Sequence, residues 1–228
     1  MKINRLLPFF LLYCFTVYSQ ENHSEIAITK LKSQKDSTIR ATLIADSLKI
    51  EKRFAEKMKW VKFESLAEYP VFNMGFMSGI IPVKNPTEIP DPNMVYKLLF
   101  ELTLNNPDSL AGEYNSSLVE VARVINLHVA SGIPQKNIIP VIVVHAAALN
   151  SITGQQYYNA HYKMNNPNLP LIEKLEAFGT KIIACGQAMT FFNIAREDLL
   201  PSIKISLTAQ TVLTAYQTKG FVLNSITR

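Results

Sequence analysis

The sequence contains few of the residues that most readily reveal a chemistry. It has two cysteines and four histidines among 228 residues, and no spacing groups them as metal ligands. Because a metal site needs several such ligands at defined spacings, we predict no metal site. No Gly-x-Gly-x-x-Gly loop and no Gly-x-Ser-x-Gly elbow is present, which argues against a dinucleotide enzyme and an elbow-type serine hydrolase. We therefore predict no cofactor.

A surface charge of one sign is also missing. The formal net charge is +5, but the bases between Lys30 and Lys62 alternate with acids such as Asp36 and Glu51. Mixed signs along a helical stretch are typical of a solvated face. Since no recognition motif accompanies them, we predict no nucleic-acid partner.

Long hydrophobic runs are absent except near the first residue. Leu6–Tyr18 is apolar, follows the basic residues Lys2 and Arg5, and leads to Ser19. The run is too short to cross a membrane and has the order of a secretory signal peptide. We predict that residues 1–19 are removed and that the protein is exported, periplasmic or secreted, without stable membrane insertion.

Removal of that segment would leave one cysteine. Cys14 lies inside the apolar run, and Tyr13 before it is not the small residue that a lipidated cysteine requires. Cys185 would then be the only thiol, so no intramolecular disulfide could form. An unpaired cysteine in an exported protein points to a free thiol or an intermolecular one.

Cys185 ends the apolar run Lys181–Cys185, which is typical of a short buried strand, and a helix is predicted directly after it. A thiol at the start of a helix faces exposed N–H groups that favour the thiolate. The alternative is a small buried residue that closes a strand, because free cysteine is among the most buried residue types. The position alone leaves both interpretations open.

From residue 94 onward the pattern alternates between strand and helix. Predicted strands cover residues 94–104, 137–145, 181–185, 203–206 and 221–226, and predicted helices cover residues 115–131, 171–178, 188–192 and 208–219. Continuous apolar runs are typical of parallel strands covered on both faces. We predict an α/β fold with a mostly parallel five-stranded sheet between helices, in a domain spanning residues 94–228.

Two segments precede this domain. Residues 20–68 begin with a polar stretch, 21–35, that we expect to be flexible, and continue from Asp36 into an amphipathic helix. The apolar residues of that helix are Ile39, Leu43, Ile44, Leu48, Phe54 and Met58. Residues 69–93 form a Pro- and Gly-containing arm that is uncharged as far as Val83. We expect the arm either to form an oligomer interface or to fold back on its own subunit.

One further residue falls at the edge where parallel sheets carry their chemistry. His145 ends the second predicted strand and Cys185 ends the third, so both lie at the carboxyl edge of the sheet. A histidine near a thiol can hold a thiolate–imidazolium pair or move the proton. The alternative is a histidine that is hydrogen-bonded to the backbone.

Four groups of residues resemble the DsrE/DsrF-like family, in particular its exported, uncharacterised branch. They are Val143–Ala146, Asn166–Ile172, Ile183–Ala188, and Thr208–Leu213 with Tyr216, Gln217 and Gly220. The similarity runs from about residue 69 to residue 226. Related exported members usually have glycine where this chain has Ala146.

The resemblance implies an α/β/α sandwich that assembles into homo-oligomers, trimers or hexamers. In the sulfur-relay members DsrE and TusD, a cysteine at the end of the corresponding strand passes on sulfur as a persulfide, and Cys185 falls on that position. His145 is then the candidate proton partner. The same motifs supply the candidate substrate-binding residues Gly186, Gln187, Asn166 and Thr211.

The resulting hypothesis is a sulfur carrier or thiol-redox protein whose partner is a small sulfur-containing molecule or a partner thiol protein. A second hypothesis is a non-catalytic module of the same fold that binds a small ligand or serves assembly. A third is a cysteine hydrolase that uses Cys185 and His145 and would also need an oxyanion site.

Overall fold

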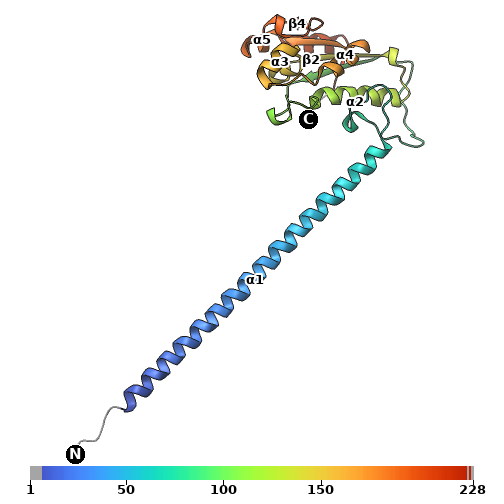
Figure 1. The fold of residues 1–228 in the computed structure, drawn as a ribbon. Helices are drawn as coiled ribbons and strands as arrows, with labels where there is room; N and C mark the ends of the chain where they lie inside the picture. The colour runs from blue at the N-terminus through green and yellow to red at the C-terminus, as the bar shows by residue number, and fades with distance from the viewer. Residues whose placement is uncertain (1–6, 225, 227–228) are drawn as a thin grey trace, which may run out of the picture. The chain divides into compact units, whose positions relative to one another are not determined.

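The computed structural model describes residues 7–224 and 226, with side chains from residue 25 onward. The chain divides into two units, Met1–Lys62 and Phe63–Arg228, which are described separately (Figure 1). The start of the predicted signal peptide, residues 1–6, lies outside the described residues. Among the described residues, no helix has an apolar stretch long enough to cross a membrane.

The first unit is formed by one long helix, α1 (Leu7–Leu66), whose last turn belongs to the second unit. Residues 21–35, which we expected to be a flexible polar stretch, are helical, and the helix is continuous through them. No glycine or proline occurs between Phe9 and Tyr69, so nothing interrupts the backbone hydrogen bonds.

The predicted start of a helix at Asp36 was wrong for a related reason. The hydroxyl groups of Ser37 and Thr38 donate to the carbonyl of Gln34, 2.9 and 2.8 Å away, and so lie inside the helix rather than capping a new one. The predicted apolar residues lie on this helix and are exposed, for example Leu43 and Phe54, each with 64% of its surface accessible.

The second unit contains one five-stranded sheet, and the predicted alternation of strands and helices is confirmed. Its strands are β1 (Tyr96–Leu102), β2 (Ile138–Val144), β3 (Lys181–Cys185), β4 (Lys204–Ser206) and β5 (Val222–Asn224). They lie in the order β4-β3-β2-β1-β5, and every neighbouring pair is parallel. Parallel neighbours place all five carboxyl ends at one edge of the sheet.

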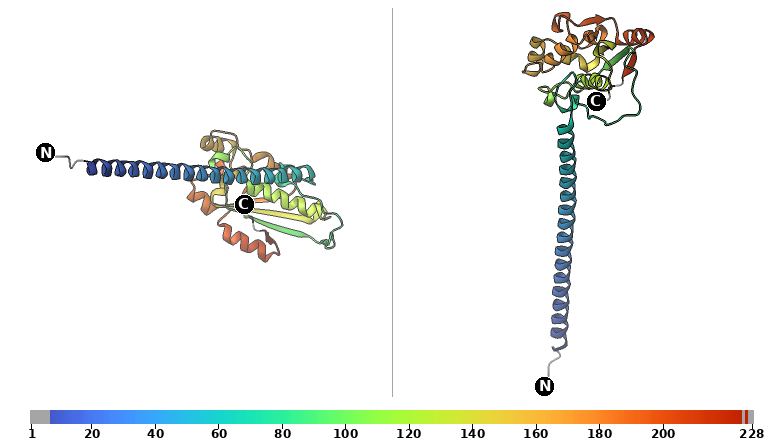
Figure 2. Two further views of the ribbon diagram at one scale, coloured as in Figure 1. Left: turned by 90° about the horizontal axis from the view of Figure 1, so that it is seen from below. Right: turned by 90° about the vertical axis from the view of Figure 1, so that its right-hand side faces the viewer.

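Helices cover both faces of the sheet, which gives the predicted three-layer α/β/α sandwich. The α-helices of this unit are α2 (Ser116–Ala130), α3 (Gln155–Tyr162), α4 (Leu169–Ala177), α5 (Gly186–Phe191) and α6 (Ala209–Thr218). The short 3-10 helices are η1 (Phe76–Ser78), η2 (Asp108–Leu110), η3 (Gln135–Asn137), η4 (Ala146–Ile152) and η5 (Arg196–Asp198). Figure 2 shows the sheet between the yellow-green helix α2 and the red helix α6.

Two apolar clusters join these layers. On one face, strand residues such as Phe100 and Val144 pack with Leu118 of α2 and Leu171 of α4. The cluster on the other face is smaller and contains strand residues with Ala209 and Leu213 of α6; its members are Leu99, Val141, Val143, Ile183, Cys185, Ala209 and Leu213. The candidate site lies on this second, more thinly covered face.

The arm folds back on its own subunit over its first half. The amide of Asn126 in α2 is fully buried and accepts hydrogen bonds from the backbone N–H groups of Val71 and Phe72 at 3.0 and 2.9 Å. It also donates to the carbonyls of Phe72 and Ser78, both at 2.8 Å. The apolar residues Met77, Ile81 and Val83 of the arm remain exposed.

Candidate functional site

Three polar side chains from neighbouring strands share the face of the sheet that α6 covers. In the register of the sheet, Glu101 is opposite Val143, and Val144 is opposite Ala184. Side chains alternate between the two faces along a strand. Glu101, Val143, His145 and Cys185 therefore lie on one face, and His145 and Cys185 occupy the next register positions beyond Val144 and Ala184. Sequence reasoning placed the pair at the same edge, and the register also places it on the same face.

His145 is held by a carboxylate. Its Nε2 lies 2.8 Å from Oε1 of Glu101, and the side chains of both residues are partly exposed. The backbone N–H of His145 donates to the carbonyl of Leu102 at 2.9 Å, which extends the β1–β2 pairing by one residue. An ionised carboxylate can only accept hydrogen bonds, so the pairing favours a proton on Nε2 and a lone pair on Nδ1.

The thiol of Cys185 is buried and has a specific hydrogen-bond donor. Cys185 is 5% exposed, and its Sγ accepts a hydrogen bond from the backbone N–H of Ala209 at 3.3 Å. Ala209 is the first residue of α6, which begins after the N-cap Thr208. The predicted donors to the thiol were those of α5, which starts at Gly186. The N–H group that donates to the sulfur belongs instead to α6. This contact joins segments that are distant in sequence, so the local sequence pattern does not predict it.

Glu101 was missed by sequence reasoning. It interrupts the otherwise apolar run of β1, Lys97-Leu-Leu-Phe-Glu-Leu102, and a lone acid in a strand of that kind is a usable signal for a functional side chain. Its partner could not be assigned without the order of the strands, because β1 and β2 are separated by the whole of α2.

Gly186 and Gln187 lie next to Cys185 but have mainly structural contacts. A Cβ atom on Gly186 would lie 2.6 Å from the carbonyl oxygen of Ser206, so glycine permits the close approach of the β4 backbone. The backbone N–H of Gln187 donates to the carbonyl of Leu207 at 3.2 Å, and its side chain is exposed.

Asn166 and Thr211 are separate from the row formed by Glu101, His145 and Cys185. The amide of Asn166 donates to the carbonyls of Ser151 and Thr153 at 3.2 and 2.7 Å. It also accepts from the backbone and side chain of Asn168, and so ties together two connecting segments. Thr211 is an exposed residue of α6 whose hydroxyl donates to the carbonyl of Thr208. The structure does not bring either residue to Cys185 through any of these contacts.

Ala146 follows His145 with a strained backbone. Its φ is +53°, a left-handed conformation that L-residues other than Asn and Asp rarely adopt. This is the position where the resemblance pointed to glycine, and the observed angle supplies the physical reason for that preference. The turn directs the chain from β2 into η4 immediately after His145.

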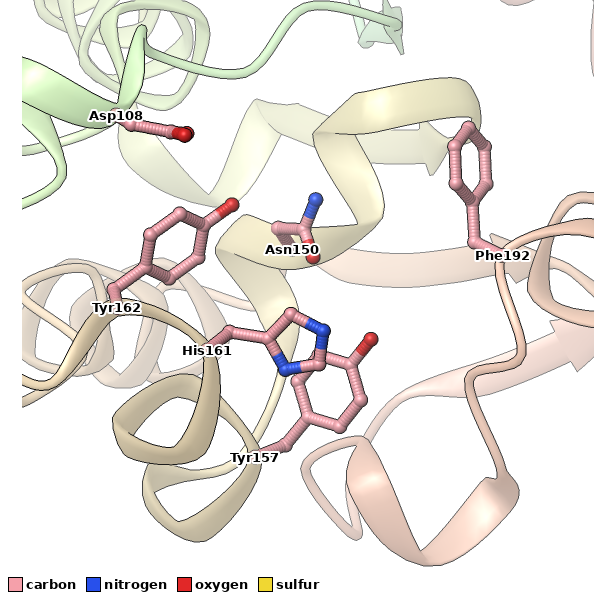
Figure 3. Close-up of a pocket in the computed structure, with 6 residues that line it drawn as sticks. All are labelled: Asp108, Asn150, Tyr157, His161, Tyr162 and Phe192. Atoms are coloured by element: carbon pink, nitrogen blue, oxygen red, sulfur yellow. The ribbon is translucent and has the colours of Figure 1, made fainter.

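A separate cavity of about 430 Å³ lies among segments that follow β1, β2 and β3. Its lining residues are Asp108 of η2, Asn150 of η4, Tyr157, His161 and Tyr162 of α3, and Phe192 after α5. Figure 3 shows the ring of His161 over that of Tyr157, with Asp108 and Phe192 on opposite sides of the group. None of the residues predicted for the site lines this cavity.

The tyrosines of α3 ionise less readily than free tyrosine. Burial, with a smaller contribution from Asp198, raises the pKa of Tyr157, and burial together with Asp108 raises the pKa of Tyr162. The buried Tyr158 donates its hydroxyl proton to the carbonyl of Ala111 at 2.7 Å, and burial raises its pKa to about 12. All three side chains are therefore neutral phenols at physiological pH.

No group of three or more His, Cys, Asp and Glu side chains within the described part of the chain is arranged to hold a metal ion. The fold and the row of side chains define a three-layer α/β protein with a cysteine and a histidine at the carboxyl edge of a parallel sheet. The model of the DsrE/DsrF-like family matches residues 99–224, and the chain belongs to this family.

Among the solved structures that are similar to this chain is that of the protein of unknown function MTH1491 from Methanobacterium thermoautotrophicum. The two are 16% identical with a TM-score of 0.42, and the similarity covers 57% of this chain and 97% of the other. No curated protein matches the sequence.

Proposed function

We propose that the protein carries sulfur or exchanges thiols at Cys185, with His145 as the proton partner and Glu101 as the residue that orients it. The observation that carries this proposal is the register-adjacent placement of His145 and Cys185 on one face, with the imidazole fixed by Glu101 at 2.8 Å. A nucleophile, a base and a group that orients the base are the parts that activated thiols require.

The proposed step is the transfer of one sulfur atom from a donor persulfide, R–S–SH. The Cys185 thiol gives its proton to Nδ1 of His145, and Sγ attacks the terminal sulfur of the donor. A new S–S bond forms on Cys185, the S–S bond of the donor breaks, and its electron pair leaves on the R–S group. That group takes the proton from His145, so the products are R–SH and a Cys185 persulfide, with no net oxidation.

Two features of the surroundings support this chemistry. The N–H of Ala209 at the start of α6 donates to Sγ and would stabilise negative charge on a thiolate or a persulfide. The low exposure of Cys185 limits access to small donors and shields a loaded sulfur from other thiols. A small sulfur-containing molecule therefore fits the site better than a direct attack by a bulky protein thiol.

The proposal extends to export and assembly. We propose that residues 1–19 direct export, which places the protein in the periplasm or outside the cell, and that the folded chain forms a homo-oligomer, a trimer or a hexamer. Phe191 at the end of α5 and Leu207 directly after β4 are 80% and 78% exposed, and they are apolar surface of the kind that interfaces cover.

A second candidate function is a non-catalytic module that binds a small ligand. The burial of Cys185 within the apolar cluster of α6 favours it, because a sulfur surrounded by Ile183, Leu213 and other apolar side chains is the common state of a structural cysteine. In this case His145 and Glu101 would form a surface pair with no role in thiol chemistry.

Intact-mass measurement after exposure to glutathione persulfide separates the two candidates. The sulfur-carrier function predicts a native protein heavier by one sulfur atom and its return to the original mass on addition of a reductant. Cys185→Ser should show no gain. A native wild-type protein that gains no sulfur, while the unfolded chain does, would exclude the carrier function and leave the ligand-binding module.

A further inference from the structure

The aromatic cavity is formed by the same edge of the sheet but shares no lining residue with the Glu101–His145–Cys185 row. Asp108, Asn150 and Phe192 belong to segments that follow three successive strands, and α3 supplies the other residues of the lining. The carboxyl edge of a parallel sheet is where ligands bind in folds of this class. The volume of about 430 Å³ is in the range of small-molecule sites.

Several polar atoms that face the cavity have hydrogen-bonding capacity to spare. Among the described residues, the hydroxyl of Tyr157 and the ring nitrogens of His161 have no hydrogen-bond partner. The amide of Asn150 uses only its Nδ2, which donates to the carbonyl of Ala147 at 3.2 Å. The hydroxyl oxygen of Tyr162 accepts from Asn105 at 3.1 Å and retains a second lone pair that can accept another hydrogen bond. Polar groups that line a cavity and have unused hydrogen-bond donors or acceptors can recognise a ligand.

The electrostatics of the cavity favour a positive charge. Asp108 is the only carboxylate among the lining residues, and no lysine or arginine is among them. The pKa values of Tyr157 and Tyr162 rise partly through Asp198 and Asp108, so the local field disfavours an anion at the phenol oxygens. The same field would oppose an anionic ligand and attract a cation.

The aromatic residues add to this preference. Tyr162 lies toward Asp108, and Phe192 lies across the hollow from it (Figure 3). The ring of His161 stacks on that of Tyr157, with centroids 4.3 Å apart and an angle of 18° between the planes, which gives a rigid flat wall. Faces of aromatic rings attract cations, and a nearby carboxylate strengthens the attraction.

We infer that this cavity is a binding site for a small organic amine, with the ammonium group at Asp108 and Tyr162 and the apolar part of the ligand against Phe192. The amide of Asn150 and the hydroxyl of Tyr157 orient further polar groups of the ligand. This inference does not depend on the chemistry of Cys185. It would still hold if Cys185 carried no sulfur, and sulfur transfer at Cys185 would not by itself establish it.

Calorimetric titration of the full chain with three matched probes tests the inference. Benzylamine, benzyl alcohol and benzoate have one ring and differ in charge. Benzylamine should bind at least about tenfold more tightly than benzyl alcohol, because a carboxylate and aromatic faces favour the cation. Benzoate should bind most weakly. Equal binding of the amine and the alcohol, tighter binding of benzoate, or no binding of benzylamine at millimolar concentrations would overturn the inference.

Two variants place the interaction within the cavity. Asp108→Asn should lower the affinity for benzylamine about tenfold and leave that for benzyl alcohol unchanged. Phe192→Leu should weaken both probes. Glu113→Gln changes an exposed acid outside the lining and serves as the control. If Asp108→Asn and Glu113→Gln reduce the amine affinity equally, the attraction is a general charge effect and the assigned site is wrong.

Discussion

Nε2 of His145 lies 2.8 Å from Oε1 of Glu101, across the boundary between β2 and β1. This contact fixes the ring from the side away from β3, and Nδ1 has no hydrogen-bond partner among the described residues. The strand next to His145 on the other side ends at Cys185. His145 and Cys185 therefore occupy adjacent register positions, and Nδ1 of His145 is not engaged by any described residue.

The amide of Asn126 should be essential to the position of the arm. Asn126→Ala leaves the buried N–H groups of Val71 and Phe72 without an acceptor, and each such loss costs roughly 1–3 kcal/mol. We expect the free energy of unfolding to fall by about 3 kcal/mol in urea titrations. The exposed Asn159→Ala should change it by less than about 0.5 kcal/mol. Equal effects of the two changes would show that the arm is not held by Asn126.

Gly186→Ala should be destabilising although alanine is the better helix former. The new Cβ would lie 2.6 Å from the carbonyl oxygen of Ser206, and a backbone atom cannot rotate away. Displacement of β4 should cost about 1–3 kcal/mol, which exceeds the gain in helix propensity. Gly154→Ala is the matched control, because its Cβ would meet the carbonyl of Asp198 at an ordinary 3.6 Å. A thermal midpoint that is equal for both variants would contradict the contact.

Ala146→Gly should stabilise the protein. The φ of +53° costs alanine about 1–2 kcal/mol, which glycine would not incur. The greater conformational freedom of glycine in the unfolded chain offsets only part of this gain in stability. A net gain of about 0.5–1 kcal/mol is expected by chemical unfolding. Ala147→Gly, at a neighbouring position with a negative φ, should instead lose about 0.5–1 kcal/mol. Destabilisation by both changes would refute the strain at Ala146.

Tyr158 should make stability depend on pH in the alkaline range. Its pKa is about 12 in the folded protein against 10 for the free side chain, so folding favours the neutral phenol. The contribution is complete below pH 10 and is lost as the pH rises through about 12. The difference in unfolding free energy between wild type and Tyr158→Phe should therefore shrink between these values. A difference that is constant with pH would contradict the raised pKa.

The sheet could be predicted from the sequence because its central strands, β2 and β3, are apolar runs between well-marked helices. Asn115 and Gly132 bound α2 as expected, with the Asn115 side chain accepting from Ser117 and Leu118 and a φ of +90° at Gly132. α3 was not predicted, since Gln155-Gln-Tyr-Tyr-Asn-Ala-His-Tyr162 has no apolar face with helical spacing and only Tyr158 is buried. The aromatic cavity was missed for the same reason.

The candidate site could be predicted only in part. Strand ends identified His145 and Cys185, because parallel strands deliver their carboxyl ends to one edge. Glu101 and Ala209 contact these residues through strand order and helix packing, which a single sequence does not encode locally. Asn166 belongs to a family motif, but its side chain donates hydrogen bonds to the carbonyls of Ser151 and Thr153. Membership of a motif alone therefore did not distinguish a structural residue from a ligand-binding one.

The most direct test of the central claim is the rate at which native Cys185 accepts sulfur from glutathione persulfide in a double-mutant cycle. His145→Gln should slow loading by about 10²-fold or more, because the histidine transfers the proton. Glu101→Gln should slow loading by a smaller factor, because the carboxylate only orients the histidine. The double variant should be no slower than His145→Gln alone, and His161→Gln should load at the wild-type rate. Unchanged loading in His145→Gln, or losses that multiply in the double variant, would contradict a Glu101–His145–Cys185 unit.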